Sequence, residues 1–444
     1  MGGIIRVWIS YWVFLLCLSC LLCAASPAPS FASVSTEIRL WHSMSGLRGE
    51  ELEQLAARFN ASQPNYRVVP RYKGTEEQTL ALALGSRRSI WGPHIVQVYE
   101  AGTADLMAQE HAVRPLWQVM ADAGQPLDWN YLPAVAGPFS DAQGRLLALP
   151  FNISTPVLYF NRAAFRKAKL DAGKPPRTWY EMPAVLGALL DSGSACAFTT
   201  AWQSWILLEN MSAWHNEEFA TAHNGMDGAD ARLAFNRSLM VRWISMLNTW
   251  LKSGYFTYSG RGSEGEARFA SGECAMLTSS SASYGELLSR AKFAKTDLAV
   301  AQLPYYDDLS AAPQNTLIGG AGLWVIAGKS REQYRGVARF LAYVARPTVQ
   351  AQWHQKTGYL PLTLEAYELT RKQGYYAANP GQEIAVRQVL RKSPTRDTMG
   401  IRLAQFLRIR GIIDEELESV WGGTKSPIDA LNTAVARGNV LLSR

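Results

Sequence analysis

The sequence lacks the short motifs that mark several large enzyme classes. It has no GxxxxGK[ST] phosphate loop, no zinc-binding HExxH and no GxSxG nucleophile elbow. A GxGxxG match begins at Gly260, but no apolar strand precedes it. Glu264 and Glu266 within and beside it would repel a phosphate, so we interpret it as a loop. The six histidines show no spacing typical of metal ligands. These absences predict a protein without catalytic residues, metal or cofactor.

Runs of basic residues and long apolar segments are also scarce. No run of Lys and Arg exceeds two residues, although the formal net charge is +7, so we expect no nucleic-acid partner. A basic chain still suits an anionic small ligand or an acidic partner. The mean hydropathy of −0.09 excludes a bundle of membrane helices. The 444 residues, 48% of them apolar, predict two or three domains with ample cores.

The one long apolar run lies at the N-terminus. Arg6 precedes an apolar run from Val7 to Ala25, and small residues follow up to Ala32. This order is typical of a secretory signal, so we predict that residues 1–32 are removed on export. An uncleaved membrane anchor and a lipid attached to one of the three cysteines in this segment are the alternatives.

Cysteine is rare in the rest of the chain. Beyond residue 32 only Cys196 and Cys274 remain, and neither has a CxxC partner or a nearby histidine. An even pair of cysteines in an exported protein predicts one disulfide, with two buried free thiols as the alternative.

Strand and helix patterns alternate along the predicted mature chain. Leu52, Leu55, Ala56 and Phe59 recur at helical spacing, which predicts an amphipathic helix over 47–60. Further predicted elements are strands at 37–41, 66–69, 95–99, 155–160, 275–277 and 316–327 and at Cys196, and helices at 76–85, 102–111, 178–190, 201–214 and 231–252. This order favours mostly parallel sheets covered by helices. Because no low-complexity linker separates the halves, we expect two lobes with several crossings and a ligand cleft between them.

The residues that remain for function suit binding rather than catalysis. Trp202 and Trp205 lie three apart on one predicted helix, so they form either an aromatic wall or core packing. The stretch 278–281 and the pair Gly319-Gly320 offer hydroxyls and backbone N–H groups to an oxyanion, or simply pack closely. Arg410 could fork onto a phosphate or carboxylate, or form a structural ion pair.

Seven segments of the chain resemble a known family. They are 41–44 (WHSM), 72–74 (YKG), 98–103 (VYEAGT), 150–156 (PFNISTP), 201–205 (AWQSW), 353–361 (WHQKTGYLP) and 414–421 (DEELESVW). Together they resemble the periplasmic glycerol-3-phosphate-binding components of bacterial ABC importers. The wider family is that of the extracellular solute-binding proteins, which includes the maltose-binding protein. The resemblance extends over essentially the whole mature chain.

The resemblance implies a fold, a location and partners. The fold is α/β, two-lobed, each lobe a mostly parallel sheet flanked by helices with the ligand cleft between the lobes. We expect residues 33–152 plus 319–361 in lobe 1 and 153–318 plus 362–444 in lobe 2. The protein would be periplasmic and monomeric, and would deliver a small phosphorylated polyol to an inner-membrane ABC permease and its ATPase. A periplasmic hydrolase and a binding protein for neutral sugars are the alternatives; an unpaired buried Arg410 would exclude the sugar.

The resemblance also implies roles for site residues. Glu100 would accept hydrogen bonds from the glycerol hydroxyls, and Trp202 and Trp205 would flank the glycerol. The phosphate and backbone-side contacts would be Ser154, Ser280, Gly320, Tyr359 and Arg410.

Glu76 departs from the family pattern, which has a tyrosine at this position. An ionised glutamate would repel a phosphate, so we expect Glu76 either to turn away or to pair with a cation. A quaternary ammonium group, as in glycerophosphocholine, would suit a carboxylate beside tryptophans. Phosphate monoesters and glycerophosphodiesters both stay candidate ligands.

Overall fold

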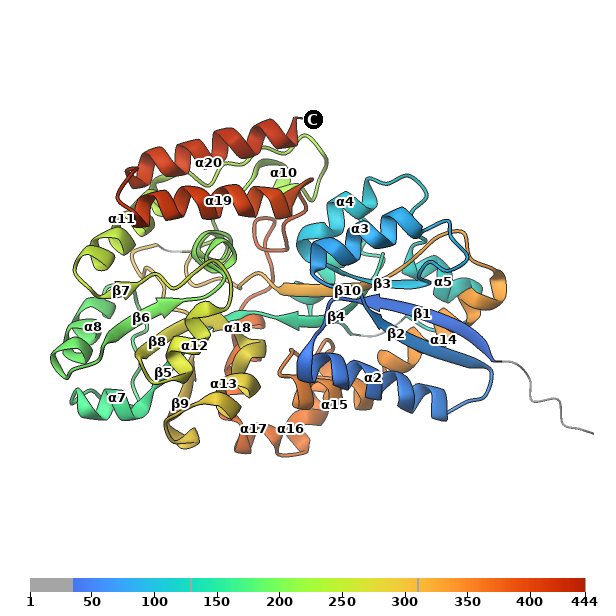
Figure 1. Ribbon diagram of the computed structural model, residues 1–444, viewed down its shortest axis with the longest axis horizontal. Coiled ribbons are helices and arrows are strands. Elements are labelled where there is room, and N and C mark those ends of the chain that lie inside the picture. Colours follow the sequence, from blue (N-terminus) through green and yellow to red (C-terminus); the bar gives the residue numbers. More distant parts are fainter. Residues whose placement is uncertain (1–34, 128–129, 310, 444) are drawn as a thin grey trace, which may run out of the picture. The chain divides into compact units, whose positions relative to one another are not determined.

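The computed structural model describes residues 35–127, 130–309 and 311–443, and Thr36 to Arg444 form one compact unit (Figure 1). The predicted signal segment, residues 1–32, lies outside the described residues. Two five-stranded sheets, each the centre of one lobe, organise this unit. Among the helices that the structure describes, none combines the length and apolar composition that a membrane span requires.

The first lobe contains the sheet β2-β1-β3-β10-β4. Its strands are β1 (Thr36–His42), β2 (Tyr66–Tyr72), β3 (Ile95–Tyr99), β4 (Leu149–Ser154) and β10 (Gly319–Val325). The pairs β1–β2 and β1–β3 are parallel, whereas β10 is antiparallel to both β3 and β4. Four of the five strands therefore run in one direction, which confirms the predicted mostly parallel sheet.

The second lobe contains the sheet β7-β6-β8-β5-β9. Its strands are β5 (Pro156–Asn161), β6 (Cys196–Thr200), β7 (Phe256–Thr257), β8 (Cys274–Ser280) and β9 (Leu298–Ala301). Only β5 runs against the other four. Cys196 pairs in register with Cys274 across β6 and β8, and the two form the predicted disulfide.

Helices cover both sheets. Those before β4, together with those between residues 331 and 389, are α2 (Gly46–Ala61), α3 (Glu76–Ser86), η1 (Glu100–Gly102), α4 (Thr103–Met107), α5 (Leu116–Asp122), α6 (Pro133–Ala136), η2 (Gly137–Phe139), α14 (Arg331–Val344), α15 (Pro347–Thr357), α16 (Leu364–Lys372), α17 (Tyr375–Ala378) and α18 (Pro380–Val389). The amphipathic helix predicted at 47–60 is α2, and its four predicted apolar residues are buried.

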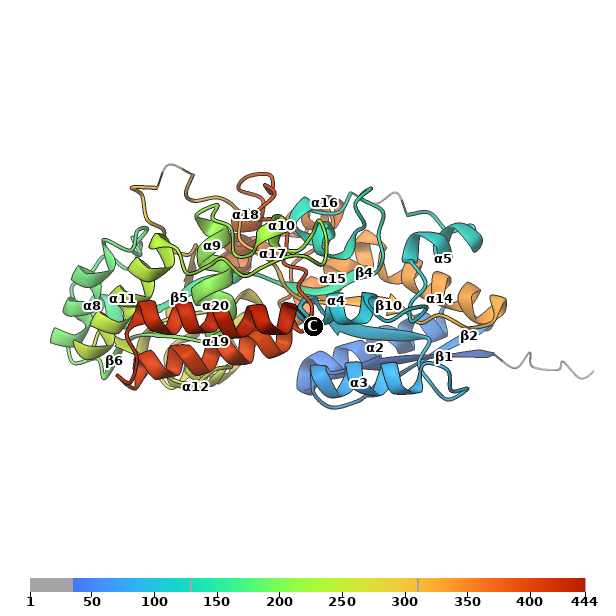
Figure 2. The ribbon, with the colours of Figure 1, turned by 90° about the horizontal axis from the view of Figure 1, so that it is seen from above.

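The remaining helices lie between β5 and β9 or at the C-terminal end of the chain. They are α7 (Arg162–Lys167), α8 (Met182–Asp191), the π-helical η3 (Ser204–Glu209), α9 (Asn210–Trp214), α10 (Thr221–Asn224), α11 (Ser238–Lys252), α12 (Glu264–Ala270), η4 (Ser281–Ser283), α13 (Tyr284–Arg290), η5 (Lys295–Asp297), α19 (Phe406–Trp421) and α20 (Pro427–Leu442). Figure 2 shows α19 and α20 side by side. The helix predicted from 231 starts only at Ser238, because Leu233 pairs with Ala220 as an isolated β-bridge.

The chain crosses between the sheets at Thr155, which joins β4 directly to β5. The Thr155 and Thr316 hydroxyls lie 2.5 Å apart, so two crossing segments are hydrogen-bonded to each other. Gln388 donates to the Pro156 carbonyl at 2.6 Å and to Thr316 at 3.3 Å. The lobe boundary predicted at 152/153 falls inside β4 and stays a prediction.

Candidate ligand-binding site

A cavity of about 420 Å³ is lined by residues from both sheets. Strand ends supply much of its wall: Ser154 ends β4, Ser280 ends β8, and Glu100 follows β3. Strand ends of an α/β sheet commonly form such sites. All nine predicted site residues line it, namely Glu76, Glu100, Ser154, Trp202, Trp205, Ser280, Gly320, Tyr359 and Arg410. Their roles toward a ligand stay predictions.

Arg410 forms two ion pairs, which confirms the structural ion pair left open by the sequence, and the guanidinium is not unpaired. Its Nε and Nη2 donate to the two oxygens of Glu209 at 2.7 and 2.8 Å, and Nη2 also donates to Glu100 Oε1 at 2.8 Å. Burial acts to lower the pKa of Arg410, but the charges of Glu209 and Glu100 raise it above its ordinary value. The guanidinium is therefore permanently charged and fixed in orientation.

Glu209 is the carboxylate that sequence reasoning missed. Its side chain is only 2% exposed, and it comes from the apolar π-helical segment η3. Burial raises its pKa, and the charge of Arg410 opposes that shift. A buried carboxylate requires a cation nearby. The single glutamate within this apolar helix could therefore have identified Glu209 as a partner of a buried arginine.

Gly320 donates its backbone N–H to Glu100 Oε2 at 2.9 Å. The predicted free N–H for an oxyanion is therefore engaged, and Glu100 accepts from both Gly320 and Arg410. Gly320 has φ +117°, and a Cβ there would lie 1.9 Å from the Asn152 carbonyl oxygen. Only glycine fits this position, which supports the close-packing alternative, while a contact of Gly320 with a ligand stays a prediction.

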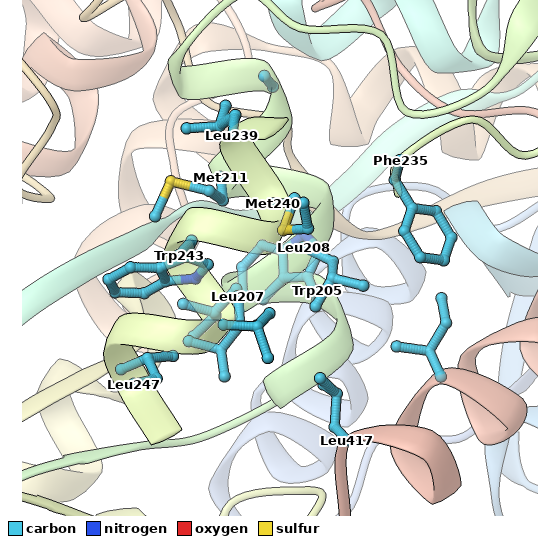
Figure 3. Close-up of a cluster of buried hydrophobic side chains, with 14 of the residues drawn as sticks. Trp205, Leu207, Leu208, Met211, Phe235, Leu239, Met240, Trp243, Leu247 and Leu417 are labelled. Atoms are coloured by element: carbon cyan, nitrogen blue, oxygen red, sulfur yellow. The ribbon is translucent and has the colours of Figure 1, made fainter. Parts of the chain in front are cut away.

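Trp202 and Trp205 do not share a helix, contrary to the sequence prediction. Trp202 precedes the helix with a left-handed backbone (φ +49°), because its N–H donates to the Gly262 carbonyl at 2.8 Å. Its side chain is 43% exposed, whereas Trp205 is buried. Figure 3 shows Trp205 within the apolar cluster of the second lobe, beside Leu207 and Leu208. A Cβ on Gly319 would lie 2.7 Å from the Trp205 ring, so the indole packs closely on that strand.

Glu76 lines the cavity, so the alternative that it turns away is wrong. It is the first residue of α3, which Thr75 caps in a capping box with Gln78. Burial and then the charge of Glu100 raise the pKa of Glu76 to about 8, against the opposing effects of Arg410 and Tyr99. At neutral pH the carboxyl is therefore protonated and can donate a hydrogen bond, which an ionised glutamate cannot.

Arg48 is a second guanidinium at the cavity that the sequence did not single out. It extends from α2, and its Nη2 donates to the Ala282 carbonyl at 2.9 Å, which joins the two lobes. Its guanidinium lies 5.3 Å from the centre of the Tyr359 ring. An arginine on an amphipathic helix ordinarily faces solvent, so the sequence carried no specific signal for it.

Several polar groups at the cavity wall already have partners, and others do not. Glu266, which lines the cavity, accepts hydrogen bonds from Ser279 and Ser283 at 2.6 and 2.7 Å. By contrast, Asn152 Nδ2 and Trp205 Nε1 are buried donors without a hydrogen-bond partner within the described residues. Buried donors of this kind ordinarily find an acceptor.

The histidines do not gather at the cavity. Burial lowers the pKa of His42, His94, His215 and His354 to about 4, so all four are neutral at pH 7. Over residues 35–127, 130–309 and 311–443, no group of three or more His, Cys, Asp or Glu side chains is arranged to hold a metal ion.

Known proteins resemble the chain over nearly its whole length. Residues 54–381 match the family model described as bacterial extracellular solute-binding protein. The sn-glycerol-3-phosphate-binding periplasmic protein UgpB of Yersinia pseudotuberculosis is 49% identical over 415 residues, 93% of this chain and 94% of the relative. The protein of the same name from Salmonella typhimurium is 50% identical over 411 residues, with coverages of 92% and 93%.

Solved structures agree in fold. UgpB from Mycobacterium tuberculosis in complex with glycerophosphocholine has a TM-score of 0.75 at 22% identity, covering 92% of this chain and 99% of that one. The cyclic alpha-maltosyl-1,6-maltose binding protein from Arthrobacter globiformis has a TM-score of 0.73 at 20% identity, with coverages of 92% and 99%. At these identities the likeness establishes the two-lobed fold alone.

Proposed function

Because the chain belongs to the family of bacterial extracellular solute-binding proteins, we propose that it captures a glycerol phosphate in the periplasm and delivers it to an ABC permease. The ligand is glycerol-3-phosphate or a glycerophosphodiester. The partners are an inner-membrane permease and its ATPase, and the protein acts as a monomer without catalysing a reaction.

The observation that carries this proposal is the unused donor of Arg410. Its Nε and Nη2 are taken by carboxylates, but Nη1 makes no hydrogen bond to the residues that the structure describes. Two N–H groups on a permanent cation therefore remain for an anion at the cavity wall. Asn152 and Trp205 add unpartnered donors, and the neutral Glu76 adds another.

The acceptors in the cavity suit the glycerol part of the ligand. Glu100 holds two hydrogen bonds, and a carboxylate has about four lone-pair sites, so it can accept from two more donors. Vicinal hydroxyls next to a phosphate would supply those donors. A neutral sugar would use Glu100 equally well but would leave the Arg410 Nη1 donors without an acceptor of matching charge.

A cationic group of the ligand, such as a quaternary ammonium next to the phosphate, could bind near Trp202. Gly262 lies in space between the Trp202 ring and the Glu264 carboxylate. A Cβ placed on Gly262 would lie 3.8 Å from that ring and 3.4 Å from a Glu264 oxygen. An exposed indole with a nearby carboxylate suits a quaternary ammonium group. Glu76, being neutral, does not serve that purpose, so we now assign the proposed cation contact to Glu264.

Calorimetric titration of the purified protein with glycerol-3-phosphate, glycerophosphocholine and maltose tests the proposal. We expect both phosphates to bind and maltose not to bind. Arg410→Lys keeps the charge next to Glu209 and Glu100 but removes the planar fork, and should weaken both phosphates by tenfold or more. Arg410→Ala is unsuitable because it would leave two buried carboxylates unpaired.

The matched control is Arg408→Lys, an exposed arginine on the same helix that donates to Gln405. It should leave affinity unchanged. Equal affinities for the Arg410→Lys protein and the parent would disprove the assignment of the phosphate site. Release of choline from glycerophosphocholine during the titration would indicate a hydrolase instead.

A further inference from the structure

Two of the most exposed large apolar side chains stand next to each other. Ile90 is 81% exposed and Trp91 is 74% exposed, the highest values among the large apolar side chains described. They lie in the loop between α3 and β3, and neither of them lines the cavity. An exposed tryptophan beside an exposed isoleucine ordinarily marks an interaction surface.

Hydrogen bonds hold the loop in this conformation. Arg39 of β1 donates to the carbonyls of both Ile90 and Gly92. The N–H of Trp91 donates to Ser89 Oγ at 3.1 Å, and that of Gly92 to the Ser89 carbonyl at 3.0 Å. The apolar tip is therefore presented by a fixed turn rather than by a loose segment.

Cationic residues lie next to the tip in the sequence and contact its flank. Arg87 and Arg88 precede it, and the Arg87 carbonyl accepts from Lys329 Nζ at 3.2 Å, which brings the β10–α14 connection alongside. Lys329 and Arg331 line a recess of about 380 Å³ together with Arg114, Arg335 and one acid, Asp122. Arg114 pairs with Asp122 and Arg335 with Glu332.

The other cations are uncompensated. Arg87, Arg88, Lys329 and Arg331 form no ion pair with any residue that the structure describes. We call the set Arg87, Arg88, Ile90, Trp91, Lys329 and Arg331 the Trp91 face. It lies at the start of β3, whereas the cavity residue Glu100 follows the end of the same strand.

We propose that the Trp91 face binds the surface of an anionic phospholipid bilayer. Tryptophan prefers the headgroup region of a bilayer, because its apolar ring can contact the acyl chains there while its N–H stays hydrated. Unpaired Lys and Arg beside it match lipid phosphates in charge. The cavity residue Glu100 follows the opposite end of β3, so lipid bound at the Trp91 face would not cover it. The Trp91 face is thus free to rest on lipid, and it would confine the protein to the membrane surface where the permease lies.

Co-sedimentation with lipid vesicles tests the proposal. The protein purified from the periplasm is mixed with vesicles of phosphatidylcholine alone or with about one third phosphatidylglycerol, at low and high salt. We expect binding to the anionic vesicles at low salt only. Arg87→Gln with Arg88→Gln should reduce the partition coefficient roughly 25-fold, about fivefold for each charge removed. Ile90→Ser with Trp91→Ser should reduce it on anionic vesicles at both salt concentrations.

Matched controls separate the face from general charge and apolarity. Lys167→Gln with Lys169→Gln removes two exposed cations from the second lobe, and Ile428→Ser removes another half-exposed isoleucine. Both should bind vesicles like the parent, and every variant should bind glycerophosphocholine like the parent. Equal binding by the Trp91-face variants and the parent would overturn the proposal. So would binding only to vesicles that contain the permease, which would identify a protein partner instead.

Discussion

Raising the pH from 7 to 9 is expected to weaken binding of a glycerophosphodiester by about tenfold, because Glu76 would lose its proton inside the cavity. Burial, and next the charge of Glu100, raise the pKa of Glu76 to about 8. Roughly ten elevenths of the protein then holds a neutral Glu76 at pH 7, and roughly one eleventh at pH 9. If the anion binds only the neutral form, affinity follows that fraction.

Stability should depend on pH in the same direction. The pKa of Glu76 is higher in the folded protein than its ordinary value of 4.5, so the folded state retains the proton that the unfolded state releases. The contribution of neutral Glu76 is fully present below about pH 4.5 and is lost as the pH rises through 8. At 1.4 kcal/mol per unit this amounts to about 5 kcal/mol over the window.

Calorimetry with glycerophosphocholine at pH 7, 8 and 9 measures the effect, since its phosphodiester does not titrate in that range. Glu76→Gln should keep neutral-pH affinity and abolish the pH dependence, and Glu76→Tyr should do the same with a hydroxyl donor. The control is Glu77→Gln, the exposed next residue of α3. A parent protein with constant affinity from pH 7 to 9, or a Glu76→Gln protein that still loses affinity, would refute the reasoning.

Three other changes test the architecture of the site. Glu209→Gln leaves Arg410 with one carboxylate, and should lower the unfolding free energy by about 3–5 kcal/mol in a denaturant titration. Gly320→Ala would place a Cβ 1.9 Å from a backbone carbonyl, so we expect a lower melting temperature and weaker binding. Replacing Cys196 and Cys274 by serine opens a loop with a sequence separation of 78, and should destabilise the second lobe by about 4 kcal/mol in the same titration. Unchanged unfolding curves would contradict each expectation.

The ends of the strands were predictable from the sequence because buried strands consist of short runs of apolar residues. Ser280 follows such a run in β8, and Glu100 follows the apolar strand β3. The carboxyl ends of parallel strands meet at one edge, so polar residues placed there converge. The family resemblance indicated which of these polar residues line the ligand site.

The pairing of charges was not predictable in the same way. Arg410 lies 201 residues from Glu209 and 310 from Glu100 in sequence, so only the tertiary fold brings them together. The backbone conformation of Trp202 could not be predicted either. A positive φ is unfavourable for tryptophan, and here it accompanies the hydrogen bond from the Trp202 N–H to the Gly262 carbonyl. Long-range contacts override local patterns at both places.

We expect the two carboxylates on Arg410 to make the cavity selective for a phosphate that carries hydroxyls. Glu209 fixes the guanidinium from the buried side, whereas Glu100 lies 2.8 Å from it at the cavity wall and would repel a bare dianion. A glycerol phosphate avoids that repulsion if its hydroxyls donate to Glu100 while its phosphate accepts from Arg410 Nη1. Sulfate, which has no donor at neutral pH, can satisfy Arg410 but not Glu100. We therefore expect sulfate to compete poorly with glycerol-3-phosphate in the calorimeter, and to compete better once Glu100 is replaced by glutamine.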